Sequence, residues 1–154
     1  MKILLIAPYV SLNYERSKNE MIREDFYPSA ALLHLGAILR ANDHEPLLLD
    51  MNNAVVHSQR ENYLEFQKKQ IIENLEKHKP DMIGLNCLFS GVFPDVLEFA
   101  KLIKQKRPDI KIALGGIHAT TFPNEILSNC NDIDYIAIGE GENSIVALAA
   151  YIEN

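Results

Sequence analysis

The chain has 154 residues, of which 15 are Lys or Arg and 21 are Asp or Glu, so its formal net charge is −6. This length is typical of a single domain, and 47% hydrophobic with 23% charged residues excludes intrinsic disorder as the main state. The acidic balance provides no electrostatic basis for general binding to nucleic acid or to an anionic membrane.

Taken in chain order, short apolar runs alternate with helical patterns five times. Residues 2–7 (KILLIA) form the first expected strand, and their nearly continuous apolar character is typical of a parallel strand buried on both faces. A helix over 30–41 with Ser29 as its N-cap follows, and then a strand over 45–51, in which Pro46 favours an edge position. The remaining expected elements are a helix over 59–78, a strand over 82–88, a helix over 94–106, a strand over 110–114, a short helix over 123–128, a strand over 134–138 and a helix from 141 to the last residue.

This alternation predicts one three-layer, doubly wound α/β domain over residues 1–154. The expected sheet is parallel and five-stranded, in the flavodoxin-like (Rossmann-like) order 2-1-3-4-5, with the first strand central and beside the third. The segment 10–25 is polar, carries many charges and exceeds the usual length of a strand–helix link, so we expect it to be disordered without ligand.

The sequence also predicts where the protein resides. No run is long and apolar enough to span a membrane, and the first strand starts too early to leave room for a signal peptide. Cys87 and Cys130 lack the spacing of metal ligands and cannot form a disulfide framework, which indicates reduced thiols. We therefore expect a cytoplasmic protein.

Ligands of such sheets bind at the carboxyl ends of the strands, so the loops there must indicate the function. The loop after the first strand contains no glycine, which excludes the glycine-rich fingerprint of a dinucleotide site. A phosphoacceptor receiver is excluded as well, because the ends of the first, third and fifth strands lack its acids and its lysine. Flavodoxin-type phosphate binding is poorly matched, since Ser11 is a lone hydroxyl in that first loop.

Candidate catalytic side chains at these loops all have simpler interpretations. Cys87 follows a strand, where a cysteine is usually a packed small hydrophobe. His118 is interpreted as a solvated loop residue, and Glu140 and Glu142 as acids favoured by the dipole at a helix N-terminus. We assign no catalytic residue and no metal ligand.

Three glycine-bearing loops do indicate a binding site. They contain Ser90 and Gly91, then Gly115 and Gly116, and finally the run from Gly139 to Glu142. Glycines let a flat or bulky ligand touch the backbone, and helix N-termini nearby offer N–H groups to a phosphate. With hydrogen bonds from Asn86 and Ser90, these loops predict a groove for a long, nucleotide-like tail.

At four places the chain resembles the N-terminal cobalamin-binding domain of cobalamin-dependent radical S-adenosylmethionine (SAM) enzymes. These places are residues 27–40 (YPSAALLHLGAILR), 79–85 (KPDMIGL), 114–120 (LGGIHAT) and 138–142 (IGEGE). The resemblance covers nearly the whole chain, and within the family it is similar to the anaerobic magnesium-protoporphyrin IX monomethyl ester oxidative cyclase subgroup.

The resemblance implies that cobalamin lies across the carboxyl edge with its dimethylbenzimidazole tail beside strands three and four. It implies tail contacts from Asn86 and Ser90 and a tail lining of glycines. The full set of implied cofactor-binding residues is Asn86, Ser90, Gly91, Gly115, Gly116, His118, Gly139, Glu140 and Gly141. We expect a large side chain at Gly115 or Gly116 to abolish binding, and His118→Ala to leave it nearly intact.

The chain departs from related cobalamin proteins in two ways. The D-x-H-x-x-G motif, whose histidine binds cobalt in methyltransferase and mutase domains, is absent after the first strand. We therefore expect no protein imidazole on the cobalt. The C-x-x-x-C-x-x-C motif of radical SAM enzymes is absent from the 154 residues, so we expect an N-terminal fragment whose missing C-terminal domain binds SAM and a [4Fe-4S] cluster.

The expected function is thus a cobalamin-binding module, not catalytic alone, of an enzyme that performs methyl transfer or oxidative cyclisation. Its expected partners are the cofactor and its own radical SAM domain. Two alternatives remain from the residues: an α/β interaction or regulatory domain that has lost its ligand, and a flavin or small-nucleotide binder.

Overall fold

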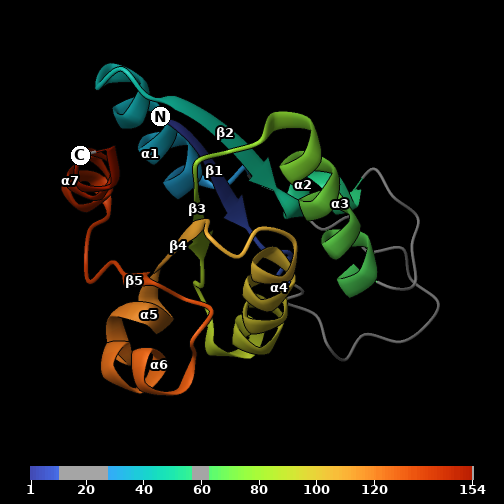
Figure 1. The fold of residues 1–154 in the computed structure, drawn as a ribbon. Coiled ribbons are helices and arrows are strands. Elements are labelled where there is room, and N and C mark those ends of the chain that lie inside the picture. Colours follow the sequence, from blue (N-terminus) through green and yellow to red (C-terminus); the bar gives the residue numbers. More distant parts are fainter. Residues whose placement is uncertain (11–27, 57–62, 154) are drawn as a thin grey trace.

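The computed structural model describes residues 1–10, 28–56 and 63–153 (Figure 1). Its five strands form one parallel sheet in the order β2-β1-β3-β4-β5, which confirms the predicted doubly wound topology. The strands are β1 (Lys2–Ala7), β2 (Glu45–Asp50), β3 (Met82–Asn86), β4 (Lys111–Gly115) and β5 (Tyr135–Ile136). Strand β1 lies inside the sheet between β2 and β3, and β2, which carries Pro46, is at the edge as expected.

Seven α-helices and one 3₁₀ turn are described around this sheet. They are α1 (Ala30–Ala41), α2 (Met51–Val56), α3 (Tyr63–His78), a 3₁₀ turn (Ser90–Val92), α4 (Phe93–Lys106), α5 (Ile117–Thr121), α6 (Pro123–Asn129) and α7 (Glu142–Glu153). Helices α2 and α5 were not predicted, and β5 is shorter than its expected span of 134–138. The first four residues of the helix expected over 59–78 lie outside the described residues, as does all but Val10 of the segment 10–25.

Two separate hydrophobic clusters hold the layers together, one on each face of the sheet. The larger one packs α3 and α4 against β-strand side chains such as Leu4, Ile83 and Ile112, with Phe99 of α4 fully buried among them. The smaller one packs α1 and α7 against the opposite face, around Ile3. Successive residues of a strand point to opposite faces, so the apolar runs seen in the sequence supply both clusters at once.

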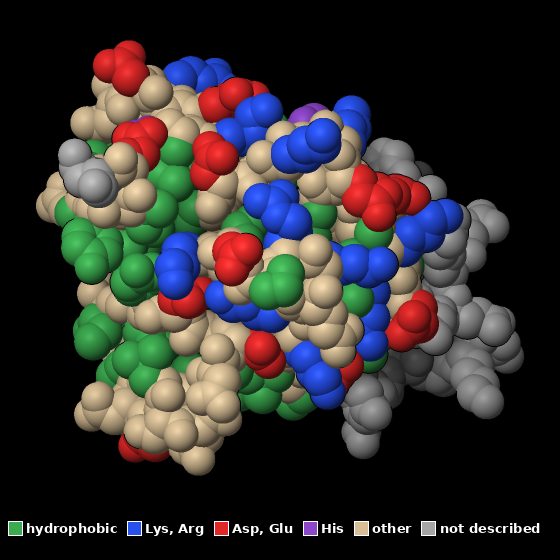
Figure 2. All heavy atoms as spheres, viewed as in Figure 1, with side chains coloured by type: hydrophobic (Ala, Val, Ile, Leu, Met, Phe, Trp, Pro, Cys, Tyr) green, Lys and Arg blue, Asp and Glu red, His purple; other side chains and the backbone are tan. Residues whose placement is uncertain are grey.

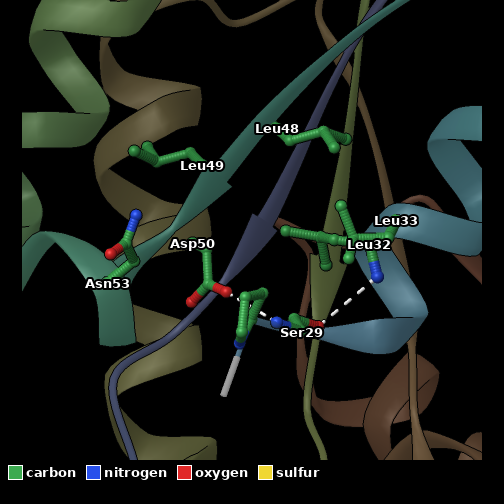
Figure 3. Close-up of a pocket in the computed structure, with 8 residues that line it drawn as sticks. Ser29, Leu32, Leu33, Leu48, Leu49, Asp50 and Asn53 are labelled. Atoms are coloured by element: carbon green, nitrogen blue, oxygen red, sulfur yellow. Dashed lines mark hydrogen bonds between the residues drawn. The ribbon is translucent and has the colours of Figure 1, made fainter. Parts of the chain in front are cut away.

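The start of α1 is fixed to the end of β2 (Figure 3). The Ser29 side chain accepts a hydrogen bond from the backbone N–H of Leu32 at 3.4 Å, which is the predicted N-cap. The backbone N–H of Ser29 in turn donates to the Asp50 carboxylate at 2.7 Å. Asn52 donates to the same carboxylate and accepts from the backbone N–H of Val10, so the exits of β1 and β2 and the entrance of α1 are joined.

No helix in the described ranges is long and apolar enough to cross a membrane. Figure 2 shows hydrophobic side chains gathered where Figure 1 places α7, β5 and α5, whereas charges of both signs mix over the middle of this face.

Candidate functional site: a cavity at the carboxyl edge of the sheet

A cavity of about 770 Å³ lies between the sheet and helices α1 and α7. Both helices begin at the carboxyl edge of the sheet and run toward its amino edge, so the cavity opens at their N-termini. Its closed end rests on the smaller hydrophobic cluster, where Ile3, Leu39, Met82 and Ala149 are fully buried.

One row of four residues crosses the sheet inside this cavity, and we call it the floor row. Strand register pairs Leu5 with Gly84, Gly84 with Ala113, and Ala113 with Tyr135, and all four line the cavity. The residues two positions further along β3 and β4, Asn86 and Gly115, are also paired and form the wall nearer the mouth. Small residues on the central strands therefore leave the space that a ligand would occupy.

The exits of β3 and β4 pass very close to each other. The Cys87 N–H donates to the Gly115 carbonyl at 2.8 Å, and the His118 N–H donates to the Cys87 carbonyl at 3.2 Å. Gly116 has a φ of +100°, and a Cβ there would lie 2.5 Å from the Cys87 carbonyl oxygen and 2.6 Å from Oδ1 of Asn86. Glycine is thus required at this position by the fold itself, independently of any ligand.

Gly115 differs from Gly116. A Cβ at Gly115 would meet only the Cβ of Ala137, at an ordinary 3.7 Å, so the backbone accepts a side chain there. That side chain would extend from the cavity wall, because Gly115 lines the cavity. The absence of a side chain at Gly115 therefore keeps space open and is not a requirement of local backbone geometry.

The loop after β5 closes the mouth from the other side. Gly139 has a φ of +76°, and its N–H donates to the Thr120 hydroxyl at 3.0 Å, which ties this loop to α5. A Cβ at Gly141 would lie 3.3 Å from Cδ2 of Leu35, so the loop packs closely on α1. Glu140 and Glu142 line the mouth and give it negative charge.

The structure brings six of the nine sequence-predicted site residues to the cavity. These are Asn86, Gly115, Gly116, Gly139, Glu140 and Gly141. Ser90, Gly91 and His118 lie outside its lining, where Ser90 Oγ and His118 Nδ1 are 2.9 Å apart. The His118 ring contacts Phe93 and Phe122, with ring centroids 4.3 and 5.2 Å away, and Phe93 packs against the larger cluster on the opposite face.

None of the four floor-row residues was among the site residues predicted from the sequence. Its clearest signal was Gly84, because a glycine inside a buried strand marks a close approach of a ligand or another chain segment. A Cβ at Gly84 would lie 2.7 Å from Cδ2 of Leu5, so the leucine leans over the glycine. Ser29, Leu32 and Leu35 also line the cavity. They lie in the segment 27–40 that resembles the family, but they were not among the predicted site residues because they do not follow a strand.

The side chains near the cavity are suited to binding. Cys87 has no solvent exposure, and burial raises the pKa of its thiol to about 11, so it is neutral at physiological pH. Among the residues that the structure describes, no three His, Cys, Asp or Glu side chains are grouped as metal ligands would be. The cavity volume is within the usual range of about 300–1,000 Å³ for ligand pockets.

Fold and cavity together define an α/β domain that binds a ligand at the carboxyl edge of a parallel sheet. The family model of the B12 binding domain matches residues 23–149, and the chain belongs to this family.

The matched relatives are considerably longer than this chain. The chain is 28% identical over 152 residues to cytidylyl-2-hydroxyethylphosphonate methyltransferase of Streptomyces wedmorensis, covering 92% of this chain and 26% of that protein. It is 26% identical over 155 residues to anaerobic magnesium-protoporphyrin IX monomethyl ester cyclase of Rubrivivax gelatinosus, and this match covers 99% of this chain and 25% of that protein. The chain thus spans about a quarter of the length of these relatives, and the predicted resemblance is confirmed.

A solved structure shares the fold. The radical S-adenosylmethionine methyltransferase TsrM from Kitasatospora setae, with cobalamin and a [4Fe-4S] cluster bound, matches with a TM-score of 0.74 at 19% identity. The match covers 99% of this chain and 24% of TsrM.

The residues present fit cobalamin, which consists of a flat corrin ring and a long tail of phosphate, ribose and dimethylbenzimidazole. The cavity is deep, apolar at its closed end and lined by glycine at its mouth, as a tail of this kind needs. Leu88 and Ile117, which line the cavity, are 40% and 63% exposed, and Ile138, which precedes the lining residue Gly139, is 61% exposed. Such a cluster of exposed apolar side chains suits the face of a corrin ring.

Proposed function

We propose that this domain holds cobalamin for a radical SAM enzyme of which residues 1–154 are the N-terminal domain. The observation that carries the proposal is the cavity itself, in which small residues of β3 and β4 face α1 and α7. Bound cobalamin would supply a cobalt centre that carries a methyl group or assists radical chemistry. SAM and the [4Fe-4S] cluster would belong to the C-terminal part of the longer protein, which would be this domain's partner.

The roles of this chain's own residues follow from their positions. Asn86 and the backbone at Gly115 and Gly116 would line one side of the tail. The loop from Gly139 to Gly141 would cover its other side, where Gly139 is held by Thr120. The exposed apolar residues on the loops would exclude water from the corrin face.

Methyl transfer and oxidative cyclisation are the two reactions that the relatives support for the full-length enzyme. The Streptomyces relative is a methyltransferase and the Rubrivivax relative is a cyclase, and their identities to this chain differ by only two percentage points. A reducing, cytoplasmic location is part of the proposal and is supported by the free thiols of Cys87 and Cys130.

The test is a titration of the 154-residue chain with aquacobalamin, followed by visible absorbance. We expect saturable binding by the unmodified chain and none by Gly115→Leu, because the new side chain would fill the tail space without disturbing the backbone. Ala37→Leu is the matched control, since Ala37 is exposed on α1 outside the cavity lining and should leave the Kd unchanged.

Two results would contradict the proposal. One is the absence of any spectral change with the folded, unmodified chain. The other is equal affinity in Gly115→Leu and Ala37→Leu. A parallel titration with flavin mononucleotide should show no saturable binding, and tight binding there would favour a flavin site instead.

A further inference from the structure

A second, smaller cavity of about 350 Å³ lies at the exit of β2 (Figure 3). Among the described strands, β2 has a neighbour on one side only, so this cavity is at a free edge of the sheet. Leu48 and Leu49 are successive residues of β2 and point to opposite sides of it, Leu48 toward α1 and Leu49 away. The cavity bends around this edge, and the first turn of α1, with Ser29 and Leu32, lies between it and the larger cavity.

The walls of this edge cavity are mainly hydrocarbon. Leu32 and Leu33 of α1 and Leu48 and Leu49 of β2 line it, and the ring of Pro28 continues the apolar surface. Leu33 and Leu48 are 52% and 43% exposed, so a ligand that covered them would remove apolar surface from water. The volume is near the lower end of the range of about 300–1,000 Å³ for ligand pockets, which suits a small ligand.

The one charged side chain among the described lining residues is Asp50, at the end of β2. Its Oδ2 accepts from the Ser29 N–H at 2.7 Å, and its Oδ1 accepts from the Asn52 N–H at 3.1 Å and from Asn52 Nδ2 at 3.3 Å. These neutral donors hold the carboxylate in place without cancelling its charge. Within the described ranges no basic side chain forms an ion pair with it, and a carboxylate can accept a further hydrogen bond.

We infer that the edge cavity binds a small amphipathic amine, which is a protonated primary amine with an apolar body. The ammonium group would donate to the Asp50 carboxylate, and such charge-assisted hydrogen bonds are the stronger ones. The apolar body would cover Leu33 and Leu48. The net charge of −6 adds a weaker, general attraction for cations.

The same lining should reject the corresponding amino acid. No Lys or Arg is among the described residues that line the edge cavity. A carboxylate on the ligand would therefore lose water without gaining a partner, and it would also be repelled by Asp50. The inference thus specifies an amine without an acid group, and it does not depend on cobalamin binding in the larger cavity.

The experiment titrates 2-phenylethylamine into the ¹⁵N-labelled 154-residue chain and follows the backbone amide chemical shifts by NMR. We expect saturable shifts centred on Leu33, Leu48 and Asp50, with a Kd on the order of 1 mM for a ligand of this size. 2-Phenylethanol lacks the charge and phenylalanine adds a carboxylate, so each should bind at least about tenfold more weakly.

Leu33→Arg is the main variant, because Leu33 is exposed and the arginine would place a cation of the chain itself beside Asp50. It should weaken binding of the amine at least about tenfold. Leu127→Arg on α6 is the matched control, since Leu127 is 46% exposed, lines neither cavity and adds the same charge. Asp50→Asn should weaken binding to a similar degree, and because Asp50 also anchors Ser29, Leu33→Arg decides the question if Asp50→Asn does not fold.

Several results would overturn the inference. They are the absence of saturable shifts with up to about 20 mM amine, which is well above the expected Kd, and equal binding of the alcohol or of phenylalanine. A Kd in Leu33→Arg equal to that in Leu127→Arg would also overturn it. Shifts centred on Gly115 and Tyr135 would place the amine in the larger cavity and reject the edge site. No corrinoid is present in this titration, so its outcome and that of the cobalamin titration are independent.

Discussion

The imidazole of His118 is held by three neighbours, Ser90 and the rings of Phe93 and Phe122. Its ring therefore belongs to a packed cluster beside the cavity, although the sequence places it next to two glycines of the mouth. We therefore still expect no protein imidazole on the cobalt, as predicted from the absence of a histidine in the sequence of the loop after β1.

We expect His118→Ala to bind aquacobalamin with a Kd within about threefold of the unmodified chain. The variant should lose some stability, about 1–2 kcal/mol in the free energy of unfolding, because it removes one hydrogen bond and two ring contacts. Urea denaturation measures the stability change and the absorbance titration measures affinity. A loss of binding as complete as in Gly115→Leu would identify His118 as a ligand after all.

At this scale the sequence identified the glycines of the mouth but could not distinguish their roles. Gly115 and Gly116 look equivalent in the sequence, and a large side chain at either one was expected to abolish binding. In the structure only Gly115 leaves room for a side chain, whereas any Cβ at Gly116 meets the Cys87 carbonyl. That distinction depends on the approach of β3 to β4, which no local pattern of residues contains.

Strand β5 has only two residues, and side-chain contacts compensate for this shortness. The Asp134 carboxylate accepts from the Ile112 N–H at 2.8 Å, from Lys104 Nζ at 2.8 Å and from Lys111 Nζ at 3.3 Å. It therefore anchors the start of β5 to β4 and α4. Tyr135 of the floor row follows directly, so this anchor also positions one end of the cavity.

Asp134 should make the stability of the domain depend on acid pH. Burial alone would raise the pKa of this carboxyl, but its hydrogen bonds to Lys104 and Ile112 outweigh burial and lower the pKa below the ordinary 3.8. Its stabilisation is thus present above that ordinary value and is lost as pH falls through the lower folded-state value. We expect Asp134→Asn to cost about 1–3 kcal/mol at pH 7 and to flatten the acid limb of the stability profile.

Urea denaturation between pH 7 and pH 2.5 measures both effects. Asp132→Asn, which removes a neighbouring carboxylate outside this cluster, is the control and should retain the acid limb. An unchanged acid limb in Asp134→Asn would show that other carboxyls cause it.

Elements with a full apolar period could be predicted from sequence, and short ones could not. The bounds of β1 and α1 are those expected, since one is a continuous apolar run and the other has a cap and a regular apolar stripe. Helices α2 and α5 have six and five residues, too few to show a helical period. Helix α2 follows β2 directly, and only Gly116 separates α5 from β4, at the point where the exits of β3 and β4 approach each other.

At the scale of the whole molecule, the cavity lies mainly on the side of the smaller hydrophobic cluster, between the sheet and helices α1 and α7. Of the buried residues in the larger cluster, Leu85 and Leu114 also line the cavity. A ligand bound in the cavity would contact the side chains of the smaller cluster that line it, and would therefore stabilise the folded state.

We expect aquacobalamin at a hundredfold excess over its Kd to stabilise the folded chain by about 2.7 kcal/mol, because it binds the folded state only. For a domain of this size, that corresponds to a rise in Tm of roughly 5–10 °C. A thermal melt followed by far-UV circular dichroism measures it. Gly115→Leu is the control, with no rise expected, and an equal rise in that variant would place the ligand outside the cavity.

The placement of the cavity has a consequence for how this family can diverge. The larger cluster of buried side chains packs α3 and α4 on the opposite face of the sheet. Substitutions in the cavity lining therefore leave most of the buried core in place, and sequences of this family can change the shape of their ligand space while the order of the strands stays the same.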